Sequence, residues 1–468
     1  MCGILGIIGK ENCVEEAVNS FEVMKNRGKD CFGVSDGKRT LYSKNYNSLK
    51  KFSKGLKSNI VLMHNLHSLI GLQKQPIESR FVTNCEIYNY KDFKLDESDS
   101  KTLYLLLKDN LRNIEKIRGS YAFAYLKNDK IILARDILGI KPLFYGKNKD
   151  KIAFASEGKV LKKLGMVPLQ LNPREIAFID LKNKKIRFKK RKFFSLKSKN
   201  KNEKTIVKKI KKLLLESVRI RLPKQKLGIL FSGGIDSVML AFLCKKIGKN
   251  VTCYVSAFKG ENLQESKDLI FARKAAKYLG IVLKEKIVDI KETEKYIKKI
   301  ANLIESRDVV KVGCALPFYI SSESAKKDGC KVLFSGLGSD EIFGGYESHK
   351  KASDINKECI KRLKTLYEND LYRDDVVTMA NTIELRLPFL DIELIDYALQ
   401  IDPKLKIKGD IKKYILRKVA LSLGINKEFA FRKKLAAQYG SNFDKAIKKL
   451  SKQYGFETKG DYLQIIKP

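Results

Sequence analysis

Histidine and paired cysteine are scarce in this sequence, which argues against the commonest protein zinc sites. The 468 residues include three histidines and nine scattered cysteines, and no two cysteines form a C-x-x-C pair. Structural zinc sites are built from sets of cysteine and histidine at short spacings. An odd number of scattered cysteines also fits no disulfide framework, so we expect a reducing, cytoplasmic setting.

Long apolar runs are missing as well. No stretch approaches the roughly 20 residues that cross a bilayer, so no membrane partner is expected. The start, MCGILGIIGKENC, has no basic region before its apolar stretch, unlike a secretory signal. Hydrophobic residues nevertheless make up 44% of the chain, which excludes a disordered protein and predicts two or three folded domains.

Charge is strongly one-sided, with 95 Lys and Arg against 53 Asp and Glu and a formal net charge of +42. The basic residues are spread along the whole chain and interleaved with acids, as in KNEKTIVKKIKKLLLE. A dedicated nucleic-acid binder clusters its basic residues, so we interpret the excess as a solvated basic surface. A nucleic-acid partner is therefore not expected, although polyanions would be attracted at low salt.

The strand and helix pattern changes once along the chain. Residues 1–195 read as short strands joined by turns, with one helix from about Val14 and another from about Asp99. Residues 196–204 are polar and are predicted to be a linker. In residues 205–468, buried strands at 227–231, 251–258, 281–288 and 331–334 alternate with helices, and the chain becomes mostly helical after about 350. This alternation predicts an α/β domain with a parallel sheet covered on both faces.

Cys2 is the first candidate for chemistry. Removal of Met1 would leave Cys2 with both a thiol and a free α-amine. An α-amine titrates near pH 8, so it can serve as the base for its own side chain. The sequence thus predicts a nucleophile that needs no histidine, against the alternative of an ordinary terminal cysteine.

A second candidate is the segment Ser232-Gly233-Gly234-Ile235-Asp236-Ser237, which follows an apolar strand and opens a helix. Glycines let the backbone approach a phosphate closely, and the N–H groups at a helix start bind anions. The GK[ST] ending of a kinase-type loop is absent. Asp236 is expected to hold Mg²⁺.

A third candidate, Ser335-Gly336-Leu337-Gly338-Ser339-Asp340-Glu341, also follows a buried strand. Ligands of open parallel sheets bind beyond the carboxyl ends of the strands, so the two loops should meet there. We expect a nucleoside triphosphate at this place, with Mg²⁺ bridging Asp236 and Asp340; two unrelated surface turns are the alternative.

A series of motifs resembles glutamine-hydrolysing asparagine synthetases over nearly the whole chain. They occur in the order of that family: MCGILGIIG, NRGKD, TNCEIYNY, ESDS, RGSYAFAYL, RDILGIKPLFYG, FASEGK, LFSGGIDS, SGLGSDEIFGGY, ELRLPFLD and FRKKLAAQYGS. The resemblance implies an N-terminal class II glutamine amidotransferase domain, an αββα sandwich of the N-terminal nucleophile type. It implies a C-terminal pyrophosphate-loop domain of the adenine nucleotide hydrolase type.

In the first domain, the resemblance implies that Cys2 attacks the glutamine carboxamide and forms a thioester. Asn84 and the backbone N–H of Cys85 match the oxyanion-hole positions. Glu86 and Asp99 match the acids that hold the α-ammonium group of glutamine. The ammonia released would reach the second domain through an internal channel.

In the second domain, the resemblance implies that ATP adenylates the β-carboxylate of aspartate and that ammonia displaces AMP. Lys434 matches a lysine that neutralises the leaving pyrophosphate, and Asp340 matches the second nucleotide loop. The remaining positions that match ATP or pyrophosphate contacts are Leu230, Ser232, Gly233, Gly234, Asp236, Ser237, Ser335 and Gly336. Glutamine, aspartate and ATP are thus the expected small-molecule partners, and a homodimer is left open.

Four positions depart from the family pattern. Lys29 stands where the family has a proline, and Cys85, where the family has a glycine, keeps the backbone donor but adds a side chain. Leu66 stands where the family has an arginine that clamps the glutamine carboxylate, and a leucine cannot replace that bidentate contact. Leu337 stands where the family has a carboxylate thought to deprotonate ammonia. Other readings therefore stay open: a ligase acting on another carboxylate, or a regulatory homologue that has lost one half-reaction. A nucleic-acid-modifying enzyme is suggested by the charge alone.

Overall fold

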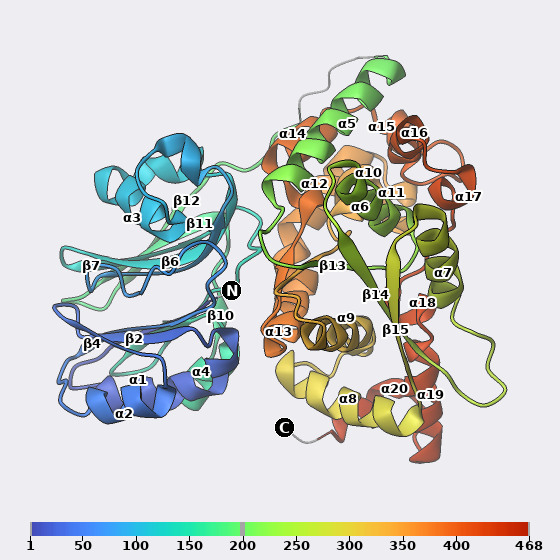
Figure 1. Ribbon diagram of the computed structural model, residues 1–468. Helices are drawn as coiled ribbons and strands as arrows, with labels where there is room; N and C mark the ends of the chain where they lie inside the picture. The colour runs from blue at the N-terminus through green and yellow to red at the C-terminus, as the bar shows by residue number, and fades with distance from the viewer. Residues whose placement is uncertain (1, 197–201, 467–468) are drawn as a thin grey trace. The chain divides into compact units, whose positions relative to one another are not determined.

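The computed structural model describes residues 2–196 and 202–466, and the chain divides into two compact units (Figure 1). The first unit comprises Met1–Phe193 and Leu366–Thr382, and the second comprises Phe194–Thr365 and Ile383–Pro468. Of the expected linker 196–204, residues 197–201 lie outside the described residues. Its end was placed too late, because helix α5 (Glu203–Ile220) already begins at Glu203, where the Asn202 side chain caps it.

The first unit contains two sheets, and every strand pair recorded in them is antiparallel. The seven-stranded sheet has the order β10 (Leu169–Gln170), β8 (Phe144–Lys147), β9 (Ile152–Ala155), β1 (Gly3–Ile8), β4 (Ile60–Leu66), β2 (Cys31–Ser35), β3 (Thr40–Ser43). The five-stranded sheet has the order β12 (Ile186–Lys190), β11 (Glu175–Asp180), β7 (Lys130–Arg135), β6 (Gly119–Lys127), β5 (Phe81–Ile87).

Strand β1 is apolar on both faces because both are covered. Ile4 and Ile8 belong to the core between the two sheets, whereas Leu5 and Ile7 belong to the core beneath the helices. This assignment follows the two-residue period of a strand. A sheet-on-sheet layer flanked by helices confirms the αββα class expected for this part of the chain.

Short helices form the outer layers of the first unit (Figure 1). The seven-stranded sheet packs on α1 (Val14–Phe21), α2 (Tyr46–Ser53) and α4 (Gly158–Lys163), and the five-stranded sheet packs on α3 (Asp99–Asp109). Single turns follow at Glu22–Arg27, Tyr90–Phe93 and Leu111–Lys116. The late segment of the unit is mostly helical, with a π-helical turn at Tyr367–Leu371 followed by α13 (Tyr372–Ala380).

The second unit contains a five-stranded sheet in which all pairs are parallel. Its order is β15 (Val282–Val288), β14 (Val251–Phe258), β13 (Leu227–Leu230), β16 (Val332–Phe334), β17 (Glu384–Arg386). The chain runs from β13 outward to β15 and then returns to the other side of β13 with β16. The switch point of the topology thus lies between β13 and β16, where α/β sheets bind their ligands.

Burial of consecutive residues in β14 shows that both faces of this sheet are covered: Cys253 to Phe258 are all buried. The helices that follow α5 are α6 (Ile235–Lys246), α7 (Lys267–Leu279), α8 (Ile290–Leu303), α9 (Val309–Lys327), α10 (Ser339–Phe343), α11 (Glu347–Lys351), α12 (Ile355–Leu366), α14 (Ile392–Ala398), α15 (Pro403–Lys406), α16 (Tyr414–Leu423), α17 (Lys427–Ala430), α18 (Ala437–Gly440), α19 (Phe443–Gln453) and α20 (Lys459–Gln464). The predicted α/β class is confirmed.

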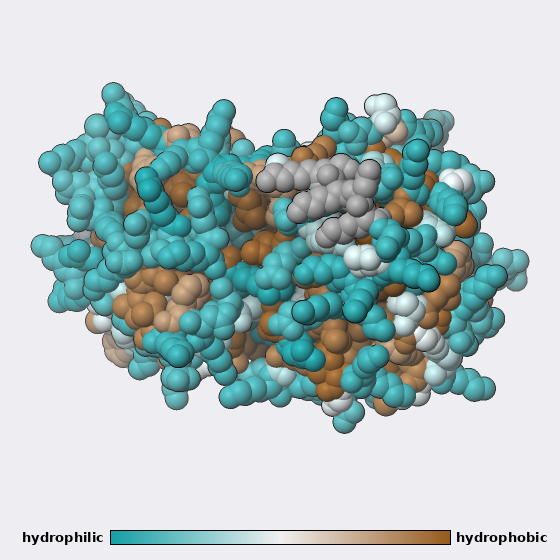
Figure 2. All heavy atoms as spheres, turned by 90° about the horizontal axis from the view of Figure 1, so that it is seen from above, coloured by the Kyte–Doolittle hydropathy of each residue, from teal (hydrophilic) through white to brown (hydrophobic). Residues whose placement is uncertain are grey.

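None of the helices described is long and apolar enough to span a membrane. On the face shown in Figure 2, hydrophilic residues cover much of the surface, with smaller hydrophobic areas between them. This agrees with the scattered basic residues of the sequence.

Candidate functional site

Cys2 stands at the start of β1, and its backbone is fixed from several directions. Its nitrogen donates to Asn84 Oδ1 at 3.1 Å, and its carbonyl accepts from Arg27 Nε at 3.1 Å. The next amide, of Gly3, donates to Asn65 Oδ1 at 2.6 Å. With the main chain held in this way, the position of the thiol depends mainly on one side-chain torsion.

Gly3 is required at this place because its neighbours come so close. A Cβ atom on Gly3 would lie 2.4 Å from Asn65 Oδ1 and 3.3 Å from Arg27 Cδ. A larger residue would displace the side chains that hold Cys2. Close contacts with Asn65 and Arg27 thus explain why the MCGI motif has a glycine at this position.

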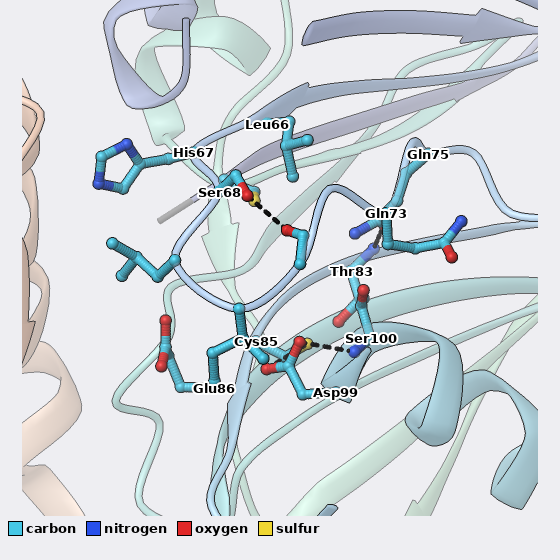
Figure 3. Close-up of a pocket in the computed structure, with 14 residues that line it drawn as sticks. Leu66, His67, Ser68, Gln73, Gln75, Thr83, Cys85, Glu86, Asp99 and Ser100 are labelled. Atoms are coloured by element: carbon cyan, nitrogen blue, oxygen red, sulfur yellow. Dashed lines mark hydrogen bonds between the residues drawn. The ribbon is translucent and has the colours of Figure 1, made fainter. Parts of the chain in front are cut away.

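Cys2 lines a pocket. Figure 3 shows this pocket and labels ten of its lining residues. The pocket is lined by Cys2 just before β1 and by residues from the end of β4 and the loop after it, β5, and the start of α3. They are Cys2, Leu66–Gly71, Gln73, Gln75, Thr83, Cys85, Glu86, Asp99 and Ser100. The structure therefore brings together four of the five residues predicted for the glutaminase site at this pocket, and the fifth, Asn84, contacts the Cys2 nitrogen.

Asp99 is held by its own helix and by the neighbouring strand. It is the first residue of α3, after the capping residue Ser98. Its Oδ1 accepts from the Ser100 amide at 2.7 Å and its Oδ2 from the Ile87 amide at 3.2 Å. A helix N-terminus stabilises a carboxylate, so Asp99 presents a fixed negative charge. Glu86, which is also buried, adds a second carboxylate to the lining.

The Cys85 side chain is a poor nucleophile in this environment. Burial, and next the charge of Asp99, raise the pKa of its thiol well above the usual value. Its Sγ lies 3.9 Å from Asp99 Oδ2 (Figure 3). The side chain is thus kept protonated, and the predicted role of Cys85 rests on its backbone N–H.

The histidines offer no evident base for Cys2. Burial lowers the pKa of His64 to about 3, and its Nε2 lies 3.2 Å from the Thr83 carbonyl, so this ring is neutral. His67 lines the pocket, and within the described residues no lysine or arginine does so. Leu66 packs against Cys2 and Cys31. Position 66 therefore supplies no arginine, and no arginine from elsewhere in the described lining takes its place.

In the second unit, the loop after β13 has the geometry of an anion site. Gly233 adopts φ +72°, and a Cβ there would lie 2.5 Å from the Phe271 backbone, so only glycine fits. Gly234 caps the 12-residue helix α6. Ser237 Oγ donates to the Gly234 carbonyl at 3.0 Å. The loop therefore directs a helix N-terminus toward the end of the sheet.

The loop after β16 meets the first loop closely. A Cβ on Gly336 would lie 2.6 Å from Asp236 Cβ. Ser339 Oγ donates to Asp236 Oδ1 at 2.5 Å. The two Gly/Ser segments singled out in the sequence are therefore neighbours.

Two lysines lie between the acids of these loops. Lys413 Nζ lies 2.7 Å from Asp236 Oδ2 and 2.7 Å from Asp340 Oδ1, and Lys434 Nζ contacts Asp340 Oδ2. Burial alone would raise the pKa of Asp340, but the charges of Lys413 and Lys434 hold it below its usual range. Burial would lower the pKa of Lys434, and Asp340 and Asp236 raise it instead.

The two acids suit a metal ion only in part. Among the described residues, no group of three or more His, Cys, Asp or Glu side chains is arranged to hold a metal. Mg²⁺ commonly takes one or two carboxylates and completes its shell with water and phosphate oxygens, which two acids at a phosphate loop would allow. Asp236 and Asp340 thus fit a nucleotide-bound Mg²⁺, with Lys413 as its competitor.

Lys413 and Arg432 were missed by sequence reasoning. Lys413 is buried and adopts φ +55° just before α16. Arg432 lies 2.6 Å from Asp268, donates to the Ser232 carbonyl, and stacks 4.3 Å from the Phe271 ring. Burial raises the pKa of Asp268 to about 6. Lys413 had no distinguishing signal in a chain with 95 basic residues, and the FRKKLAAQYGS motif, which contains Arg432, pointed only to Lys434.

Leu337 lies half-buried in the second loop, and its amide donates to Ser335 Oγ at 3.3 Å. Glu341, four residues on, is buried and accepts from the Tyr346 hydroxyl at 2.5 Å. The loop thus has carboxylates at Asp340 and Glu341, whereas position 337 is apolar.

A cysteine at the start of a central strand in an αββα unit, with acids in its pocket, is the arrangement of a glutamine amidotransferase. A Gly/Ser loop at the switch point of a parallel sheet is that of an ATP-using enzyme. The family model "Asparagine synthase" matches residues 209–355 and 347–459, and the model "Glutamine amidotransferase domain" matches residues 68–163. The chain belongs to the asparagine synthase family, a family of ATP-dependent, glutamine-hydrolysing ligases.

Similar proteins span the same two parts. A Methanocaldococcus jannaschii protein, provisionally named asparagine synthetase (glutamine-hydrolysing) 1, is 32% identical over 100% of this chain and 99% of its own length. The Gallus gallus asparagine synthetase is 29% identical, over 89% of this chain and 80% of its own length. The Escherichia coli asparagine synthetase B is 28% identical, over 89% and 78%.

Proposed function

We propose that this chain makes asparagine from aspartate, with ATP as the energy source and the amide of glutamine as the nitrogen source. Two separate sites support the proposal: a cysteine pocket in the first unit and a paired Gly/Ser loop site in the second. Residues 1–195 would be the amidotransferase domain and residues 205–468 the synthetase domain. The nine free cysteines agree with a cytoplasmic setting.

The first half-reaction is glutamine hydrolysis. Once Met1 is removed, the α-amine of Cys2 takes the thiol proton, and Sγ attacks the glutamine carboxamide carbon. Ammonia leaves with that proton, and water then hydrolyses the thioester to glutamate. The hydrogen bond from the Cys2 nitrogen to Asn84 Oδ1 orients the base.

Transition-state stabilisation would come from β5. Because Asn84 Oδ1 faces the Cys2 nitrogen, the donor end of this amide is Nδ2, which would serve the oxyanion together with the Cys85 N–H. One such donor is typically worth about 10²–10³ in rate. Glu86 and Asp99 would hold the α-ammonium group of glutamine. Without the family's arginine, the carboxylate is left to His67 and to main-chain amides of the 66–75 loop, which predicts weak glutamine binding.

The second half-reaction takes place at the paired loops. The triphosphate would lie along the backbone from Leu230 and Ser232 to Ser237, with Ser335 and Gly336 opposite. Asp236 and Asp340 would hold Mg²⁺, and the metal would supply positive charge near the pyrophosphate. Lys434 adds a further positive charge on the leaving group. Lys413, which pairs with both acids, would compete with the metal for them.

The reaction at this site has two substitution steps, the first at the α-phosphorus of ATP and the second at the acyl carbon of the activated aspartate. The aspartate β-carboxylate attacks the α-phosphorus and pyrophosphate leaves. Ammonia then attacks the acyl carbon, AMP leaves, and one proton is lost. Leu337 cannot take that proton, so either another base acts or the acceptor is a different carboxylate. A ligase for another acid is therefore the second candidate, and Leu337 is the observation that favours it.

Purified protein with ATP, Mg²⁺ and ammonium tests the synthetase half, with aspartate present or absent. The proposal expects asparagine and pyrophosphate in equal amounts, both dependent on aspartate. Exchange of pyrophosphate into ATP that requires another carboxylic acid, and ignores aspartate, would favour the second candidate.

A further inference from the structure

Arg27 joins the nucleophile to a part of the chain far away in sequence. Its Nε donates to the Cys2 carbonyl at 3.1 Å. Its Nη1 donates to Glu157 Oε1 at 2.9 Å, and its Nη2 lies 2.8 Å from Asp375 Oδ2. The Arg27 side chain is 1% exposed, and the side chains of Glu157 and Asp375 are 3% and 4% exposed. The guanidinium is thus held on three sides by groups buried with it.

We propose that Asp375 is a positioning residue for the Cys2 nucleophile: it acts through Arg27, although it lies in the sequence range of the synthetase domain. The inference rests on the proposed glutaminase reaction. It adds to the glutaminase site a residue from a chain segment that lies outside the first 195 residues and their motifs.

The segment that carries Asp375 is bound to the first unit along its length. The Tyr372 ring packs on Phe144 with centroids 4.9 Å apart. The Tyr367 carbonyl accepts from Gln170 Nε2 at 3.3 Å, and Thr382 Oγ1 donates to the Asn26 carbonyl at 3.1 Å. These contacts, before and after Asp375, keep its carboxylate in one place.

Glu157 cannot replace the contact that Asp375 makes with Arg27. The other oxygen of Glu157 is paired with Lys159 at 2.5 Å, so this carboxylate is shared between two cations. Burial would lower the pKa of Arg27, and Asp375 first, then Glu157, raise it. Without Asp375, the guanidinium loses one of its two carboxylates and is free to turn away from the Cys2 carbonyl.

Removal of the Asp375 charge should also change the pKa of the Cys2 α-amine. Among the described residues, Asp375 from α13 and Glu157 next to α4 pair with Arg27, and Lys159 pairs with Glu157. The charge of Arg135, from β7, also acts on Asp375. An Asp375→Asn change leaves the Arg27 guanidinium less compensated beside Cys2. The extra positive charge disfavours the nearby ammonium form, so the pKa of the α-amine falls and the acid limb of the pH profile moves to lower pH.

Asp374 provides a matched control. It precedes Asp375 in α13, is fully buried, and pairs with Arg373 at 2.7 Å rather than with Arg27. Asp375→Asn, Asp374→Asn, Arg27→Gln and the Asp375→Asn/Arg27→Gln pair are made in the full chain. Thermal unfolding and ATP–pyrophosphate exchange are measured for each variant, so that the assays are run at a temperature at which it is folded. An Asp375→Glu variant tests rescue by the same charge.

Two readouts are measured across pH: kcat/KM for glutamine hydrolysis, and the rate at which iodoacetamide alkylates Cys2, followed by mass spectrometry of the N-terminal peptide. We expect Asp375→Asn to lower kcat/KM at least tenfold and to shift both acid limbs downward. Asp374→Asn should stay within about threefold of wild type. The double variant should be no worse than Arg27→Gln, because both act through one group.

The proposal fails if Asp375→Asn behaves like Asp374→Asn, or if the Asp375 and Arg27 effects add. If the wild-type protein hydrolyses no glutamine, the proposed function fails, and the alkylation profiles still decide the role of Asp375. Unchanged profiles would then overturn it, and a shifted profile would support it.

Discussion

Lys413 Nζ lies 2.7 Å from Asp236 Oδ2, so the acid of the Gly/Ser loop after β13 is paired with a buried lysine. The two residues are 177 positions apart in the sequence. The same lysine lies 2.7 Å from Asp340, and it therefore joins the two loops through one charge. Lys434 also pairs with Asp340, so two lysines offset the charges of these two acids.

A Lys413→Met change should weaken the nucleotide site without touching the cysteine pocket. Breaking a buried ion pair typically costs about 3–5 kcal/mol, since the acids left behind repel each other. We expect ATP–pyrophosphate exchange to fall at least tenfold and the second unit to unfold at lower temperature. Lys412→Met is the control, because the half-buried Lys412 pairs with Glu347 and not with the two acids. Equal exchange rates in the two variants would contradict the assigned role of Lys413.

Changing either acid should impair the ATP step selectively. For Asp236→Asn and Asp340→Asn we expect a loss of about 10²-fold or more in ATP–pyrophosphate exchange, with higher Mg²⁺ needed for half-maximal rate, while glutamine hydrolysis is largely kept. A Mg²⁺ titration of the exchange rate measures both. Variants that exchange as fast as wild type at every Mg²⁺ concentration would refute the metal assignment.

Cys2→Ala should abolish glutamine hydrolysis and leave the ammonia-dependent reaction intact, because the two chemistries belong to separate units. Cys85→Ala is the matched control. It removes a thiol from the same pocket but keeps the backbone N–H, so a change of no more than a few-fold is expected. Retention of Met1 should mimic Cys2→Ala, since it converts the α-amine into an amide. Loss of both activities in a folded Cys2→Ala protein would count against two independent sites.

Leu337→Glu tests the missing base. If the chain is a slow synthetase, the new carboxylate should raise asparagine formation, because a general base typically contributes about 10²–10⁴-fold. Leu337→Gln is the control, as it has the same length and no charge. Rates at several ammonium concentrations separate base catalysis from altered binding. No gain at any concentration, with normal ATP affinity, would exclude the slow-synthetase account.

Many elements of the fold followed from local patterns. Short apolar runs between turn signals, such as β4 and β6, and strand–helix alternation after residue 205 are visible in neighbouring residues, so the sequence predicts them. The αββα layering was expected only from the family resemblance. The strand β17 was not predicted because it has only three residues, Glu384–Arg386, and exists through pairing with β16.

The residues missed at the sites are those whose roles depend on distant contacts. Cys2, Asp236 and Asp340 stand in short motifs beside turns and strand ends. Lys413 and Asp375 have no such local signal, and their places are set by partners 177 and 348 positions away (413 − 236 and 375 − 27). In so basic a chain, only tertiary structure tells a buried lysine from the solvated ones.

Isotope transfer tests the central claim most directly. Protein, ATP, Mg²⁺ and aspartate are mixed with glutamine labelled with ¹⁵N in the amide, and the amino acids are analysed by mass spectrometry. The account predicts ¹⁵N in the side-chain amide of newly made asparagine, with AMP and pyrophosphate formed in equal amounts. Cys2→Ala should make unlabelled asparagine from added ammonium alone. No asparagine from aspartate with either nitrogen source, in protein that binds ATP, would contradict it.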